Sequence, residues 1–98
     1  MHKALDKLYH SLHKKAKKIT TSINNAIELF APNADDSLKK TLDHYIRVRH
    51  AEIQCAVLSP LVKDVMDIMD IYDAKPSKIV VLTTNFTIKE FPLPMNLH

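Results

Sequence analysis

The sequence predicts a mainly α protein: a three-helix bundle with a long first helix and a small C-terminal β-hairpin or strand. Apolar residues recur at helical spacing in three successive segments, and β-branched and aromatic residues gather only after residue 78. The 98 residues, 46% of them apolar, have the size and composition of one domain with one core. We therefore expect residues 1–98 to form a single domain.

A long amphipathic helix is predicted over about residues 3–30. Its apolar positions form a stripe about 100° wide, made of Leu5, Leu8, Leu12, Ala16, Ile19, Ile23, Ala26, Ile27 and Phe30. Pro32 disfavours helical geometry at Ala31 and so sets the end of the helix. At a rise of 1.5 Å per residue the helix is about 42 Å long. It outspans a compact globule of this size, so we expect part of it to project or to pair with another chain.

A second helix is predicted over about residues 34–58. Asn33 is its expected N-cap, and Asp35 and Asp36 fall in the first turn, where the helix dipole favours negative charge. One face of this segment is apolar and comprises Leu38, Leu42, Tyr45, Ile46, Ile53, Ala56 and Val57. That spacing places the face toward the core.

A third helix is predicted over about residues 60–73. Ser59 and Pro60 are typical of an N-cap followed by proline at the first helical position. Alternatively, Pro60 kinks one continuous helix, and the sequence leaves both possibilities open. Three aspartates, Asp64, Asp67 and Asp70, share the side opposite the apolar residues. One interpretation makes them cation ligands; the favoured one is a solvated face or pairing with the lysines of the first helix.

Two strands are predicted near the C-terminus, over about residues 78–83 and 86–91. Their β-branched and aromatic residues favour a hairpin that turns through residues 83–85. Pro92 and Pro94 end the second strand and leave an extended tail over residues 92–98. An isolated hairpin is marginal in water, so we expect it to pack on the helices or to pair with another chain.

Positive charge is concentrated in the first fifth of the chain. Residues 1–20 hold six lysines and one aspartate, a net charge of +5, and the remainder carries −2 of the total +3. Lys3, Lys7, Lys14 and Lys18 lie opposite the apolar stripe, with Lys17 at the margin. This basic face favours nonspecific nucleic-acid binding, an anionic membrane surface or an acidic partner; the alternative is an ordinary solvated face.

Arg49 interrupts the apolar face of the second helix. Burying a guanidinium requires a paired acceptor, so one interpretation makes Arg49 an anion-binding or interface anchor. In the other, its aliphatic stem packs on the core while the charged group reaches solvent or Glu52.

Several classes of function are disfavoured by composition. Glycine is absent, so neither a phosphate-cradling loop nor a dinucleotide turn can form. Cys55 is the only cysteine, which excludes an internal disulfide and favours a reducing, cytoplasmic setting. No apolar run is long enough to span a bilayer, and the N-terminal segment lacks the apolar region of a signal peptide. His10 and His13 have no neighbouring cysteine or carboxylate to complete a metal site.

These observations lead us to expect no enzyme, no cofactor and no metal ion. The leading hypothesis is a small noncatalytic regulator, adaptor or inhibitor that binds another protein and forms a homo-oligomer through the first helix or the C-terminal strands. Nucleic-acid binding through the basic face is the second hypothesis, and peripheral binding to anionic membranes is the third.

Overall fold

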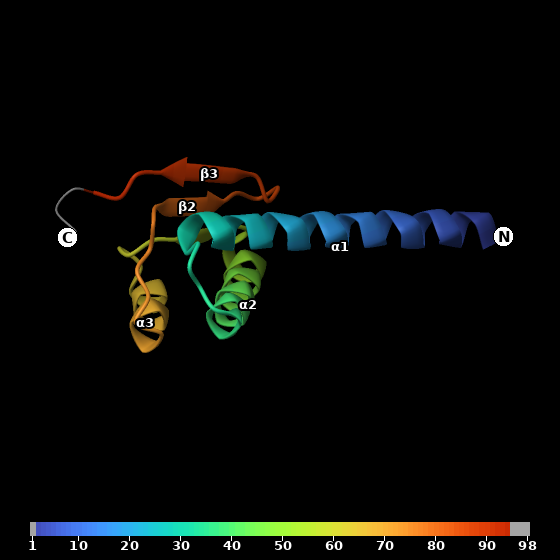
Figure 1. Cartoon of the computed structure of the whole chain (residues 1–98). Coiled ribbons are helices and arrows are strands. Elements are labelled where there is room, and N and C mark those ends of the chain that lie inside the picture. The colour runs from blue at the N-terminus through green and yellow to red at the C-terminus, as the bar shows by residue number, and fades with distance from the viewer. Residues whose placement is uncertain (1, 95–98) are drawn as a thin grey trace.

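The computed structural model describes residues 2–94, and the side chains of the first helix from Lys14 onward. Its elements follow the order α1, α2, β1, α3, β2, β3. The molecule measures 60 Å along its longest axis and 23 and 21 Å across, because α1 extends far beyond the other elements (Figure 1). The mainly helical class is confirmed. The expected three-helix bundle is not confirmed, since the three helices share their core with a three-stranded antiparallel sheet in the described residues.

Helix α1 spans His2–Phe30, in agreement with the helix predicted over residues 3–30. Its second half supplies buried residues to the core, and Ala31 extends its last turn by donating to the Ile27 carbonyl at 2.7 Å. The amide of Ser77 donates to the Phe30 carbonyl at 2.7 Å. The end of α1 is therefore tied directly to the segment that leads into the sheet.

Helix α2 spans Asp36–Ile53 and is shorter than the predicted 34–58. Asp35, not Asn33, is the N-cap, and its side chain accepts from the Leu38 amide at 2.8 Å. The helix ends at Gln54, which adopts a left-handed conformation with φ 56° and donates its amide to the His50 carbonyl. This conformation normally favours glycine, which the chain lacks. The sequence therefore gives no signal for the C-terminal end of α2.

Strand β1, Ala56–Leu58, occupies residues that were predicted to be helical. It pairs antiparallel with β2, with Ala56 opposite Leu82 and Leu58 opposite Val80. A short apolar run is compatible with either a helix or a strand, and here β2, which is distant in the sequence, supplies the hydrogen bonds of a strand. Because this strand joins the edge of β2, the sheet has three strands instead of the predicted two.

A turn, not a helix start, follows at Ser59 and Pro60. The amide of Val62 donates to the Ser59 carbonyl at 3.1 Å, which puts Pro60 at the second turn position, and the Leu61 amide donates to Ser59 Oγ. Helix α3 begins three residues later than predicted and spans Lys63–Ile71. Pro60 thus separates the two helices and does not kink one.

Strands β2, Ile79–Leu82, and β3, Ile88–Phe91, form the predicted hairpin with slightly shorter arms. The loop between them closes through a turn in which the Phe86 amide donates to the Thr83 carbonyl at 2.9 Å. Phe86 itself is left-handed, with φ 60°, at a position where hairpins ordinarily use glycine. Residues 92–94 form no helix or strand, and the rest of the expected tail, 95–98, lies outside the described residues.

One core joins all six elements. It comprises Ile23, Ala26, Ile27, Phe30, Ala31, Leu38, Leu42, Ile46, Ala56, Leu58, Val65, Met69, Val80 and Leu82, with Ile88 of β3 packed against it. Helix α1 lies against β2, α2 lies against β1, and α3 packs on α2. The helices therefore cover the sheet face that carries Val80 and Leu82.

Candidate functional site

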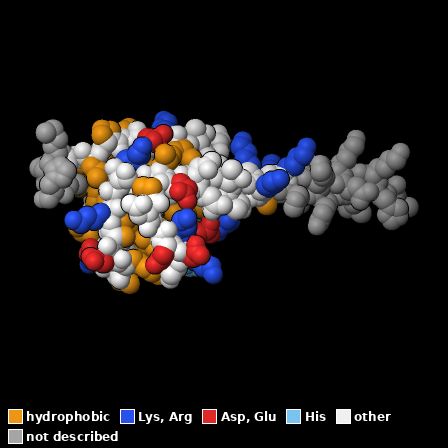
Figure 2. All heavy atoms as spheres, in the orientation of Figure 1, with side chains coloured by type: hydrophobic (Ala, Val, Ile, Leu, Met, Phe, Trp, Pro, Cys, Tyr) orange, Lys and Arg blue, Asp and Glu red, His pale blue; other side chains and the backbone are white. Residues whose placement is uncertain are grey.

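The exposed lysine segment of α1 is the most strongly charged part of the described surface. Lys14, Lys15, Lys17 and Lys18 are all exposed and form no ion pair among the described residues. Figure 2 shows lysine side chains gathered where α1 leaves the rest of the molecule. Lys3 and Lys7, the other members of the predicted basic face, lie outside the described side chains.

The apolar stripe of α1 changes its environment along the helix. Ile23 and Phe30 are fully buried, Ile19 is partly buried against the core, and Ala16 is exposed. The sequence continues the same stripe through Leu12, Leu8 and Leu5. Within the described residues, packing on the body therefore stops near Ile19, although the stripe itself continues.

Arg47 fixes the point at which α1 meets α2. Its Nη2 donates to Thr20 Oγ1 at 3.2 Å, and its Nε donates to Asp43 at 2.7 Å. A side chain of α2 thereby holds α1 two residues after the last exposed lysine of the segment. The junction between the charged half and the packed half is marked by a specific contact as well as by burial.

Arg49 does not enter the core. Its Nη1 donates to Glu52 at 3.2 Å while its side chain stays 38% exposed, as the second interpretation of this residue expected. Tyr45, one turn earlier, and then Glu52 raise the pKa of the Arg49 guanidinium further above its already high ordinary value. Arg49 thus presents a permanent charge at the surface of α2.

His50 is the buried polar residue on α2, and no pattern in the sequence pointed to its role. Its Nε2 lies 2.9 Å from the Thr83 carbonyl oxygen, to which it donates, and its ring stacks on Phe86 with centroids 3.8 Å apart. Both partners belong to the hairpin loop. The stacking and the hydrogen bond fasten the hairpin to α2, and we expect the stacking to offset part of the cost of the left-handed backbone at Phe86.

Tyr72 joins the end of α3 to the start of α2. Its hydroxyl lies 2.9 Å from Thr41 Oγ1 and 3.1 Å from Ser37 Oγ. Both hydroxyls can turn a proton toward the ionised phenolate, so Ser37 and then Thr41 lower the pKa of Tyr72 below its ordinary value.

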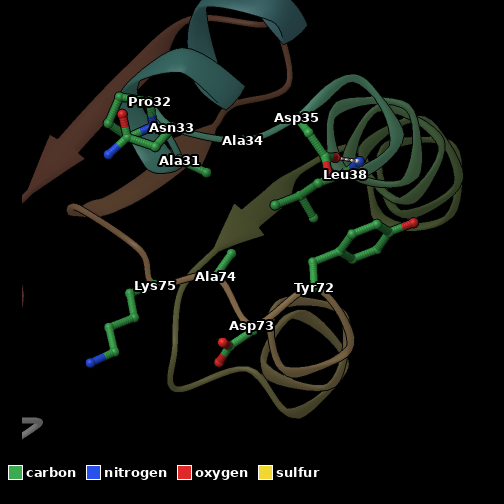
Figure 3. Close-up of a pocket in the computed structure, with 10 residues that line it drawn as sticks. All are labelled: Ala31, Pro32, Asn33, Ala34, Asp35, Leu38, Tyr72, Asp73, Ala74 and Lys75. Atoms are coloured by element: carbon green, nitrogen blue, oxygen red, sulfur yellow. Dashed lines mark hydrogen bonds between the residues drawn. The ribbon is translucent and has the colours of Figure 1, made fainter.

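A shallow pocket of about 320 Å³ lies beside this junction. Apolar side chains line it, together with Asn33, Asp35, Tyr72, Asp73 and Lys75. In Figure 3, Lys75 extends away from Tyr72, and the Asp35 carboxylate is engaged in capping α2. The lining combines apolar side chains with polar groups of both signs, which suits noncovalent contact and presents no nucleophile with an adjacent base.

Metal-binding and reactive clusters are not found among the described residues. No group of three histidine, cysteine or carboxylate side chains there could hold a metal ion. Cys55 is partly buried and unpaired, Asp64, Asp67 and Asp70 are exposed, and His10 and His13 lie outside the described side chains. In the described part of the chain, no helix has the length and apolarity needed to cross a bilayer.

Compared with known proteins, the chain matches no family model, no curated protein and no solved structure. We therefore infer its function from its own surfaces, of which the projecting half of α1 is the most distinctive.

Proposed function

We propose that this protein is a small noncatalytic regulator, adaptor or inhibitor that binds another protein and that self-associates through α1. The observation that carries the proposal is the projection of α1, which makes the molecule 60 Å long although it is only 23 Å wide. The side chains of α1 from Lys14 to Lys18 are exposed. A helix segment without tertiary contacts is marginal in water, so a partner surface is the physical reason to keep it.

The apolar stripe supports self-association in particular. A solvated helix gains nothing from a continuous apolar stripe, whereas a partner that covers leucines contributes about 25 cal/mol for each Å² removed from water. Leu5, Leu8 and Leu12 continue the stripe that is buried at Ile23 and Phe30. A second copy of the chain offers the same stripe, and a two-fold arrangement closes the assembly.

Light scattering coupled to gel filtration tests this proposal. We expect the wild-type chain, of mass 11.2 kDa, to scatter as a dimer at micromolar concentration. Replacing Leu5, Leu8 and Leu12 together by serine should yield a monomer. A control with serine at Lys3, Lys7 and Lys14, on the opposite face, should stay dimeric. A strictly monomeric wild type at high micromolar concentration would contradict the proposal.

Partner binding needs a separate test. Affinity capture from native lysate, with and without nuclease, distinguishes a protein partner from one tethered by nucleic acid. A protein that is retained after nuclease treatment, and lost when the stripe or Arg49 is altered, supports the role of regulator or adaptor. Capture that depends wholly on intact nucleic acid argues against it.

The exposed lysines favour a second candidate function, nonspecific nucleic-acid binding. Phosphate contacts release counterions, so the affinity for duplex DNA should fall steeply with salt, by a slope of about 0.9 for each contact. Glutamine at Lys3, Lys7, Lys14 and Lys18 should abolish binding without changing the circular dichroism spectrum. Retention that is constant between low and moderate salt would exclude this candidate. Flotation on liposomes with and without acidic lipid tests the membrane alternative.

A further inference from the structure

The sheet has a second apolar face, opposite the core. Side chains alternate between the faces of a strand, so the neighbours of buried Val80 and Leu82 point the other way. The ladder places Val57 opposite Val81 and Ile79 opposite Phe91 on this outer face. The remaining residue of the outer face is Lys89, which lies on β3 opposite Val81. The outer face is therefore apolar at every position except Lys89.

The described helices leave this outer face uncovered. Their buried apolar residues all belong to the core on the face of Val80 and Leu82. Val57, Ile79 and Val81 are correspondingly partly exposed, and Phe91 is 47% exposed. An antiparallel sheet with one solvated face normally alternates apolar and polar residues, whereas β2 is apolar throughout. Such a strand is typical of a sheet that is covered on both faces.

Helix α1 has the dimensions and the chemistry to cover it. Its segment before Ile19 runs from His2 to Lys18 and is about 25 Å long at 1.5 Å per residue. A strand as short as β2 spans only about 13 Å. The stripe that packs on the core face in the second half of α1 continues along this segment. The lysines lie on the opposite side of the helix and would stay in water.

We infer that the outer face of the sheet is the docking site for the first half of α1 from a second copy of the chain. A two-fold axis parallel to the sheet turns one sheet over relative to the other, so the stripe that lies on the core face of its own sheet meets the outer face of the partner's. Each copy then covers the other's sheet, and the dimer closes. Lys89 is on the edge strand, where its stem can reach solvent beside the docked helix.

This inference rests on the proposed self-association and names the surface that α1 meets. Two charged variants test it: Leu8→Lys on the helix and Val81→Glu on the sheet. Each alone places an unpaired charge in both copies of the docking site, so each should weaken dimerisation about a hundredfold. Mixed together, they form a heterodimer in which one docking site pairs the introduced lysine with the introduced glutamate and the other site is wild type. Scattering of the mixture should therefore show the dimer restored.

Matched controls carry the same new charges outside the interface. Ser11→Lys, on the lysine side of α1, and Thr84→Glu, in the exposed hairpin loop, should leave the dimer unchanged. If the wild type is a dimer but Val81→Glu, still folded by circular dichroism, dimerises equally well, α1 pairs elsewhere and only this inference falls. If the wild type is a monomer, the proposed self-association falls with it.

Disulfide trapping gives a readout that does not depend on the stability of Val81→Glu. In a Cys55→Ser background, chains with Leu8→Cys are mixed with chains carrying Val81→Cys and oxidised. A covalent heterodimer is expected, and replacing the first partner by Ser11→Cys should reduce its yield at least about tenfold. Equal yields from the two helix positions would overturn the inference.

Discussion

The two halves of α1 belong to one unbroken helix but are stabilised in different ways. In the second half, Ile23, Ala26, Ile27 and Phe30 are buried to 2% exposure or less, and Arg47 and Ser77 bond to the helix from other elements. In the first half, the described side chains from Lys14 to Lys18 are all exposed. Among the described residues of that half, 14–18, no packing on the core adds to the backbone hydrogen bonds and intrinsic helix propensity within a single chain.

This difference shows that amphipathicity alone does not determine where a helix is packed. The stripe is as regular at Leu8 and Leu12 as it is at Ile23 and Ile27. What changes near Ile19 is the presence beneath the helix of the core, to which both α2 and the sheet contribute. A stripe that outlasts its own sheet is the physical reason to expect a partner.

The largest effect on stability should come from truncating a buried side chain in the packed half of α1. Phe30→Ala removes a fully buried aromatic side chain and should lower the free energy of unfolding by about 3–5 kcal/mol. Leu8→Ala, measured at concentrations where the chain is monomeric, should change it by less than about 0.5 kcal/mol. Urea denaturation of both variants makes the comparison, and similar losses would show that the two halves are equally packed.

Hydrogen exchange should resolve the same contrast along the backbone. In dilute protein, amides of residues 14–18 should exchange at least about a hundredfold faster than those of residues 23–27, because no tertiary packing opposes their opening. Raising the concentration should protect residues 14–18 if α1 docks on a second copy. Uniform protection along α1 in the monomer would contradict the difference between its packed second half and its exposed first half.

A smaller effect is expected at the contact that fastens the hairpin over the body. His50→Ala removes the stacking on Phe86 and the bond to the Thr83 carbonyl, and should cost about 1–3 kcal/mol. Phe86→Gly in that background should recover part of the loss, since glycine accepts the left-handed backbone freely. If Phe86→Gly stabilises the wild type as much as it stabilises His50→Ala, the stacking does not offset the strain of the left-handed backbone.

The smallest effect should occur at Tyr72, away from both halves of α1. Its folded pKa is lowered by Ser37 and Thr41, so the phenolate favours the folded state. This contribution is fully present above the unfolded pKa of about 10 and is lost as the pH falls through the folded pKa. Ultraviolet titration, with Tyr72→Phe to assign the signal, should show a higher pKa in Ser37→Ala. An unchanged pKa would contradict the hydrogen-bond explanation.

Elements whose signals are local could be predicted from the sequence. The stripe and Pro32 located α1 to within a residue, and β-branched residues located β2 and β3. The projection of part of α1 and the concentration of lysines in its first half were also expected, and the described lysines agree with this.

What the sequence missed depends on contacts between distant segments. Residues 56–58 became a strand because β2 pairs with them, and Gln54 ended α2 in a conformation usually marked by glycine. His50 could not be identified as a structural residue because its partner Thr83 lies 33 positions away. The exposure of the outer face of the sheet could not be predicted either, since the periodicity of β2 alone does not tell which of its faces is covered.

The elongated shape has a consequence for how the protein moves through a solution. Its radius of gyration is 15.6 Å, against about 13 Å for a compact chain of this length. A monomer of this shape diffuses slowly for its mass and elutes early from a gel-filtration column, as a larger globular protein would. In the proposed dimer the projecting halves of α1 lie along the partner's body, so two chains occupy a length that one chain already spans. Dimerisation should therefore double the scattered mass while shifting the elution position only slightly.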